Sequence, residues 1–166
     1  DGLREDNFNI SFFNAYCNGR TGYPIVDASM RALRSTGWLN FRMRAMLVSF
    51  ASYHLWLHWR ETSLFLARQF VDYEPGIHYC QHQMQSGVTG INSIRIYSPV
   101  KQGMDQDPDG TFIKRWVPEL RDVNPEVLHR LDCLHDLAPA YPKPIVNEKT
   151  SRLAAADKIY AIRSTS

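Results

Sequence analysis

Residues 19–33 read Gly-Arg-Thr-Gly-Tyr-Pro-Ile-Val-Asp-Ala-Ser-Met-Arg-Ala-Leu, and Thr-Gly-Trp follows at residues 36–38. Pro24 suits the first turn of a helix, because its missing N–H needs no partner there. Gly37 is a typical residue at the end of a helix. Between them, apolar residues recur at the spacing of one helical face, at Ile25, Val26, Met30 and Leu33. This stretch therefore predicts a helix with one buried face.

The same periodicity predicts helices on both sides of this stretch. A long helix is expected from about Asn40 to Trp59, with one apolar stripe at Met43, Met46, Leu47, Phe50, Tyr53, His54 and Leu57. A helix over Ser63–Val71 should turn Leu64, Ala67, Phe70 and Val71 inward. The other expected helices are Phe12–Cys17, Pro75–Ser86, Phe112–Trp116, Pro125–Leu131 and Glu148–Ile162, the last capped by Asn147.

The segment from about residue 87 to 111 breaks the helical pattern. Glycines and prolines punctuate it, and Asp107-Pro108-Asp109-Gly110 is a strong turn signal. We expect a long irregular loop here, and loops of this length are often functional. Because no β-alternation or internal repeat is present, the sequence predicts an all-α fold, a multi-helix bundle formed as one domain over residues 1–166.

The composition is that of an ordinary globular domain. The chain has 166 residues, of which 44% are hydrophobic and 22% charged, and its net charge of +2 does not demand a nucleic-acid partner. The three cysteines are far apart, which favours a reducing compartment, so we expect a cytoplasmic protein, or a nuclear one in a eukaryote. No apolar run approaches the ~20 residues that cross a bilayer. Because the chain begins at Asp1, we expect it to belong to a longer polypeptide.

Histidine spacing suggests a metal site, but only weakly. Glu74, His78 and His82 lie at i, i+4 and i+8 on one helical face, which could grip a transition metal, and His54 and His58 repeat the spacing. Such pairs also arise by chance, and neither belongs to a His-Glu-x-x-His sequence. We therefore expect no intrinsic metal. No glycine elbow or Gly-x-Gly-x-x-Gly sequence is present, which argues against a nucleophilic triad and a Rossmann cradle.

The order of several motifs resembles the helical FAD-binding domain of the photolyase/cryptochrome family. Residues 19–33 resemble the family's G-x-T-G-x-P-x-V-D-A-x-M-R-x-L, and residues 36–44 its T-G-W-M-H-N-R-x-R. Residues 70–74, 97–103, 107–110, 116–120 and 141–146 are similar to further family elements, in the family's order. The resemblance covers roughly residues 12–163.

The resemblance implies a helical bundle that holds FAD, with the cofactor surrounded by Trp38, Phe41, Arg44, Asp72, Glu74 and His78. Asp72 could accept from the flavin N3–H or pair with Arg44. The resemblance places Trp59 and His82 on the family's electron path, and we take Arg42, Arg95 and Lys101 as candidate nucleic-acid contacts. The family's upstream FAD-clasping segment and N-terminal antenna domain are absent from this sequence, so the rest of the polypeptide is an expected partner.

The departures from the family pattern bear on function. Phe41 and His78 replace residues that are usually Asn, and His82-Gln83-Met84 stands where the family has W-Q-W. The two lost tryptophans usually serve electron transfer and contact with damaged bases. The leading hypothesis is therefore a light-sensing or redox flavoprotein. The alternatives are a light-driven DNA photolyase, whose partner would be DNA, and an interaction module that has lost the cofactor.

Overall fold

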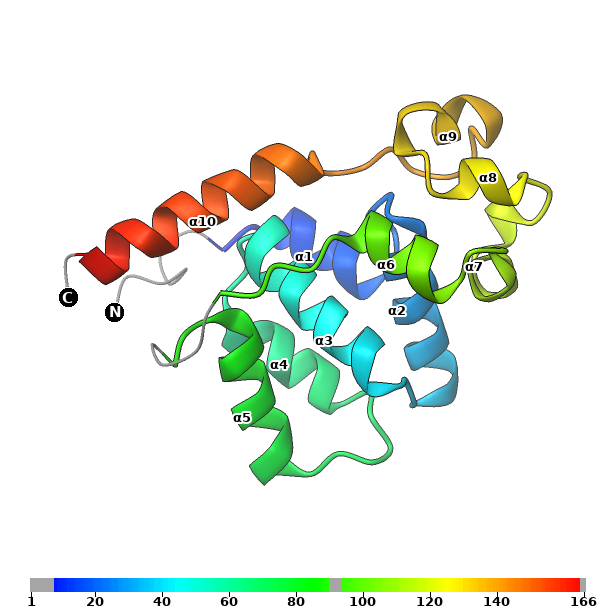
Figure 1. Ribbon diagram of the computed structural model, residues 1–166. Helices are drawn as coiled ribbons and strands as arrows, with labels where there is room; N and C mark the ends of the chain where they lie inside the picture. Colours follow the sequence, from blue (N-terminus) through cyan, green and yellow to red (C-terminus); the bar gives the residue numbers. More distant parts are fainter. Residues whose placement is uncertain (1–7, 90–93, 165–166) are drawn as a thin grey trace.

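The computed structural model describes residues 8–89 and 94–164. Over these ranges every element of regular secondary structure is a helix (Figure 1). The prediction of an all-α fold is confirmed. The α-helices are α1 Ile10–Cys17, α2 Pro24–Thr36, α3 Phe41–Ser49, α4 Trp59–Ala67, α5 Pro75–Ser86, α6 Pro99–Gln106, α7 Thr111–Trp116, α8 Pro125–Leu128, α9 Leu131–Leu137 and α10 Glu148–Ser164. A π-helix, Phe50–His54, continues α3, and a 3-10 turn, Pro118–Leu120, follows α7.

The helix predicted from residues 19–33 forms the centre of the molecule. Helix α2 begins at Pro24, and Gly37 ends it in the left-handed conformation at φ 72°. Its predicted apolar face is buried, as is the stripe along α3 and the π-helix. Helix α2 packs against α1, α3, α6 and α7, so one continuous core joins both halves of the chain.

The start of α2 is tied to the C-terminal part of the chain through Asp27, which is fully buried. Its carboxylate accepts hydrogen bonds from the backbone N–H and hydroxyl of Thr21, from Gly22 N–H and from the hydroxyl of Tyr141. Gly22 is at φ 79°, and a Cβ there would lie 2.4 Å from the backbone of Lys143. The close crossing of these two segments therefore requires glycine.

The long helix expected from Asn40 to Trp59 is interrupted. Helix α3 passes into the π-helix at Phe50, the chain leaves helical geometry after Leu55, and Trp56 takes a positive φ of 52° before α4 begins at Trp59. The predicted stripe is nevertheless buried along its length, including Tyr53 and His54 in the π-helix.

The segment 87–111 is not irregular throughout, because α6 forms within it. Pro99 occupies the first turn, the side chain of Ser98 accepts from Lys101 N–H as a cap, and Gly103 lies where a Cβ would meet the ring of His129 at 2.7 Å. The proline and glycine that suggested a loop are thus a helix start and a close packing contact. Residues 90–93 of the expected loop lie outside the described residues.

Helix α10 runs along the outside of the bundle (Figure 1). It packs on the π-helix, where Nε2 of buried His54 donates to Tyr97 O and Nδ1 lies 2.9 Å from the hydroxyl of Ser151. In the described residues, no helix combines the length and apolar character that a membrane span requires.

Candidate flavin pocket

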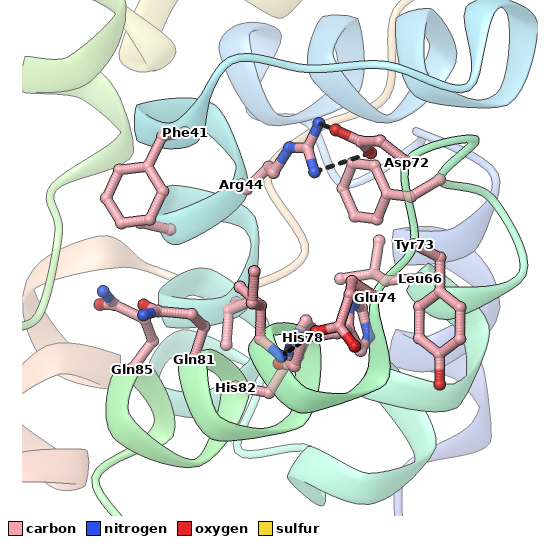
Figure 2. Close-up of a pocket in the computed structure, with 14 residues that line it drawn as sticks. Phe41, Arg44, Leu66, Asp72, Tyr73, Glu74, His78, Gln81, His82 and Gln85 are labelled. Atoms are coloured by element: carbon pink, nitrogen blue, oxygen red, sulfur yellow. Dashed lines mark hydrogen bonds and ion pairs between the residues drawn. The ribbon is translucent and has the colours of Figure 1, made fainter.

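A pocket of about 200 Å³ lies between α3 and α5 and is also lined by residues of α4 and of the stretch that precedes α5. Figure 2 shows Phe41 and Arg44 of α3 on one side and Gln81, His82 and Gln85 of α5 on the other. The pocket is lined by Phe41, Arg44, Ala45, Val48, Leu66, Phe70, Asp72, Tyr73, Glu74, Ile77, His78, Gln81, His82 and Gln85. It thus brings together five of the six residues that the sequence assigned to the cofactor, and His82.

Arg44 and Asp72 form a two-pronged ion pair at one edge of the pocket. Nη1 and Nη2 of Arg44 donate to the two carboxylate oxygens of Asp72 at 3.0 and 2.8 Å, and Nε donates to Leu39 O at 2.7 Å. The guanidinium lies 4.1 Å from the centre of the Phe70 ring. The hydrogen bonds from Arg44 hold the pKa of Asp72 below its usual value. The sequence left two partners open for Asp72, the flavin N3–H and Arg44, and in the structure Asp72 pairs with Arg44.

Glu74 begins α5 and serves as its cap. The Glu74 carboxylate accepts from Ile77 N–H at 2.8 Å, and Pro75 occupies the first turn. This local arrangement fixes where α5 starts and therefore which of its side chains reach the pocket. Glu74 itself lines the pocket.

His78 and His82 lie next to each other in the wall of the pocket, with ring centres 4.1 Å apart and ring planes tilted by 37°. Nε2 of His78 donates to Ser63 O at 2.9 Å, and Nδ1 of His82 donates to His78 O at 2.8 Å. Burial lowers the pKa of both rings, and the neighbouring His78 lowers that of His82 further, to about 4. Both imidazoles are therefore neutral at neutral pH.

The possible metal ligands do not converge on one point. Glu74 caps α5, while His78 and His82 use ring nitrogens to contact backbone carbonyls. Within residues 8–89 and 94–164, no three His, Cys, Asp or Glu side chains are grouped as a metal ion would need.

Trp38 is the one predicted cofactor residue that lies elsewhere. It lines a second pocket of about 360 Å³ together with Asn40, Phe112 and Trp116, between α2, the start of α3 and α7. Its side chain is 56% exposed. Only two residues separate Trp38 from Phe41, yet the two side chains line different pockets at the start of α3.

The remaining predicted residues are dispersed. Trp59 is half-buried at the first position of α4, where it stacks on His58, and it does not line the flavin pocket. Arg42, Arg95 and Lys101 are exposed, on α3, on the stretch before α6 and on α6.

Sequence reasoning missed Gln81 and Gln85, which also line the pocket. A signal for the two glutamines was available, because residues 78, 81, 82 and 85 share one face of a helix at i, i+3, i+4 and i+7. Apolar walls, an ion pair and neutral hydrogen-bonding groups suit a flat heteroaromatic ring. Among residues 8–89 and 94–164, two buried acceptors of the lining, Gln81 Oε1 and His82 Nε2, have no hydrogen-bond partner, so the pocket can still serve a ligand that brings donors.

Comparison with known proteins gives consistent matches over nearly the whole chain. Residues 2–161 match the family model described as the FAD binding domain of DNA photolyase. The chain is 38% identical over 143 residues to the deoxyribodipyrimidine photo-lyase of Vibrio cholerae, covering 84% of this chain and 30% of that protein. It is 32% identical over 158 residues to cryptochrome DASH of Gloeobacter violaceus, covering 89% and 31% of the two chains.

Among solved structures, an archaeal photolyase from Sulfolobus tokodaii, described with two FAD molecules, superposes with a TM-score of 0.89 at 36% identity. That match covers 96% of this chain and 37% of the other. The chain thus spans about a third of the length of the relatives it matches.

Proposed function

Because the chain belongs to the family of the FAD binding domain of DNA photolyase, we propose that it forms the helical wall of the FAD pocket in a light-driven DNA-repair flavoprotein. The observation that carries this proposal is the gathering of Phe41, Arg44, Asp72, Glu74 and His78 around one pocket. The photo-lyase from Vibrio cholerae supports repair over the sensory hypothesis.

We further propose that residues 1–166 act as one helical unit and that the remaining FAD contacts come from a preceding part of the same polypeptide. The share of each relative that this chain covers supports a longer protein. Large apolar side chains exposed at the pocket support a covering segment, since Phe41 and Ile77 are each 64% exposed.

In this proposal each pocket residue has a defined task. The Arg44–Asp72 pair fixes one polar edge, Phe70 and Leu66 supply apolar contact, and the helix cap at Glu74 holds α5 in place. FAD, when bound, supplies light absorption and electron transfer. Arg42, Arg95 and Lys101 are proposed to contact DNA phosphates, which their exposure permits.

The test uses the full-length protein that contains this chain, loaded with FAD and reduced with dithionite in the dark. It is mixed with an oligonucleotide carrying one cyclobutane pyrimidine dimer and illuminated. We expect intact pyrimidines to be restored in the light and not in the dark. Dimers that persist under illumination of the reduced, FAD-loaded protein would contradict a repair function.

A second candidate function, light sensing or another redox role, is favoured by one observation. His82 stands where the family has a tryptophan, and a neutral, buried imidazole is a much poorer one-electron donor than indole. We expect slow photoreduction of the oxidised, full-length protein and faster photoreduction in His82→Trp. A sensory protein would show no repair even when chemically reduced, whereas a repair enzyme would repair dimers once reduced.

The third hypothesis, an interaction module without cofactor, predicts a colourless protein. The intact Arg44–Asp72 pair in an open pocket argues against it. A yellow full-length preparation whose absorption spectrum is that of a flavin would exclude it.

A further inference from the structure

Two adjacent side chains of α5 carry buried acceptor atoms that have no hydrogen-bond partner in the part of the chain that the structure describes, and both side chains line the flavin pocket. They are Oε1 of Gln81 and Nε2 of His82. Folded proteins seldom leave a buried acceptor unpaired, because the lost contact with water is not replaced. The His82 side chain is only 4% exposed. The pair therefore indicates that a ligand supplies a donor at this wall.

The hydrogen bonds already present decide which nitrogen of His82 is available. Nδ1 lies 2.8 Å from the carbonyl oxygen of His78, and a carbonyl only accepts, so Nδ1 carries the hydrogen. The ring is neutral at neutral pH, because burial and His78 lower its pKa to about 4. Nε2 is then a lone pair, and it can accept but not donate.

Gln81 differs from His82 in being adaptable. Its amide can present either its oxygen or its NH2 group after a half-turn about the last bond, so it pairs equally well with an N–H or a C=O of a ligand. Figure 2 shows Gln81 and Gln85 next to each other, across the pocket from Phe41. Of the two unpaired groups, His82 alone imposes a fixed requirement, namely a donor.

The flavin ring meets that requirement. Its N3–H is a donor whether the ring is oxidised or reduced, and N5 becomes a donor after reduction, when two electrons and a proton are added. The adjacent carbonyls C2=O and C4=O can accept from the NH2 group of Gln81. Apolar walls from Val48 and Leu66 suit the faces of such a ring.

We propose that Nε2 of His82 accepts a hydrogen bond from a ring N–H of the flavin, with Gln81 pairing beside it. This inference rests on the proposed function, because it takes FAD as the ligand. It assigns to His82 a role in binding the ring, at a position that the resemblance places on the family's electron path.

The test measures FAD binding by the full-length protein, oxidised in one series and reduced with dithionite in a second. His82→Phe keeps a flat ring and removes the acceptor, and we expect it to raise Kd about fivefold, the value of one ordinary hydrogen bond. Gln83→Ala, on the same helix but not in the pocket lining, is the matched control, and its Kd should stay within about twofold of the parent.

The pattern across the two series identifies the donor. An equal loss in both supports N3–H, and a loss confined to the reduced series supports N5–H. His82→Phe binding FAD like the parent in both series would overturn the proposal.

A second measurement does not depend on the variant folding. In the parent labelled with ¹⁵N-histidine, FAD should shift the Nε2 signal of His82 from a free lone pair towards a hydrogen-bonded one. An unmoved signal would overturn the proposal. A parent that takes up no FAD would instead overturn the proposed function, and this inference with it.

Discussion

Two buried titratable residues, Asp27 and His82, illustrate different ways of burying a polar side chain. Burial raises the pKa of Asp27, and hydrogen bonds from Thr21, Tyr141 and Gly22 oppose that rise. At His82, Nδ1 donates to the carbonyl oxygen of His78, while Nε2 has no hydrogen-bond partner among the described residues. Burial lowers the pKa of the ring, which is therefore neutral. Asp27 therefore serves the fold, while His82 retains a group that a ligand can use.

Asp27→Asn should destabilise the fold by about 2–4 kcal/mol. The four groups that contact the Asp27 carboxylate all act as donors to it, and an amide would turn its own N–H2 group towards some of them. Urea denaturation gives the free energy of unfolding. Tyr141→Phe is the matched control, because it removes one of the four hydrogen bonds and should cost about 1 kcal/mol. Equal losses in the two variants would contradict a central role for the carboxylate.

The stability of the fold should depend on the protonation of His82. Its pKa is about 4 when folded, against 6.5 for an unperturbed histidine, so between these values the unfolded chain binds the proton that the folded chain excludes. Stability is therefore fully present above pH 6.5 and falls as the pH drops towards 4, by roughly 3 kcal/mol for this residue.

This dependence is checked by urea denaturation between pH 4.5 and 7. Burial also lowers the pKa of His54 and His78, so the parent should lose stability on acidification through all three rings. His82→Phe should lose less than the parent, and Gln83→Ala should follow the parent. If the free energy of unfolding of His82→Phe depended on pH as that of the parent does, protonation of His82 would cost the folded parent no stability.

At the scale of helices, the sequence predicted the existence of most elements and misjudged their limits. Pro24, Gly37 and Pro75 marked helix ends correctly, because each acts through its own backbone geometry. The break in the helix after the π-helix could not be predicted, because the apolar stripe continues through the break. In the structure the break is marked by the positive φ of Trp56. Local periodicity reports which side is buried, not whether the backbone bonds continue.

The helix expected over Ser63–Val71 shows the same limit. Helix α4 instead spans Trp59–Ala67 and turns Thr62, Ser63 and Leu66 inward. Leu64 and Val71 are 38% and 78% exposed, so their predicted inward positions were wrong. Small polar residues occupy the inner face because α5 packs closely there, which a count of apolar residues does not detect.

Gly22→Ala should cost more than 2 kcal/mol, an order-of-magnitude value for backbone strain combined with a clash. The added methyl would meet the backbone of Lys143, which cannot move aside as a side chain could. Gly76→Ala is the matched control, since Gly76 has no positive φ and its nearest neighbour is a side-chain oxygen of Glu74 at 3.1 Å, not backbone. Comparable melting temperatures for the two variants would contradict this account.

The Arg44–Asp72 pair connects α3 to the residues before α5. Its contribution to the free energy of unfolding should be small. The Asp72 side chain is 47% exposed, so water screens the pair and Asp72→Ala should change the free energy of unfolding by less than about 1 kcal/mol. FAD affinity of the full-length protein should nevertheless fall, because the polar edge of the pocket is lost. Urea denaturation and flavin titration measure the two effects separately, and unchanged FAD affinity would contradict the placement of the pocket.

At the scale of the whole molecule, the residues of the candidate site could not be predicted from the sequence pattern of any single helix. Motif order indicated Arg44, Asp72 and His78 together, and the fold brings them to one pocket. Trp38 was grouped with them by its place in the same motif, yet it lies in the second pocket. Sequence proximity near a helix start does not decide on which side of the helix a residue lies. Gln81 and Gln85 were missed because glutamine on a helix is usually a solvent-facing residue.

The last prediction concerns how much of the cofactor this chain can hold unaided. Phe41, Val71 and Ile77 are 64%, 78% and 64% exposed, and Phe41 and Ile77 line the pocket itself. Such side chains are normally covered by another surface. Residues 1–166 produced alone should therefore bind FAD at least tenfold more weakly than the same residues in the full-length protein, about 1.4 kcal/mol, and should tend to self-associate.

Equilibrium dialysis against FAD compares the two affinities, and light scattering reports association. Phe41→Ser and Ile77→Ser together provide the control for exposed apolar surface, since they should reduce association of residues 1–166 without restoring affinity. A monomeric 1–166 chain that binds FAD as tightly as the full-length protein would mean that these helices supply the whole pocket. The apolar rim would then need another explanation, such as contact with the bases of DNA.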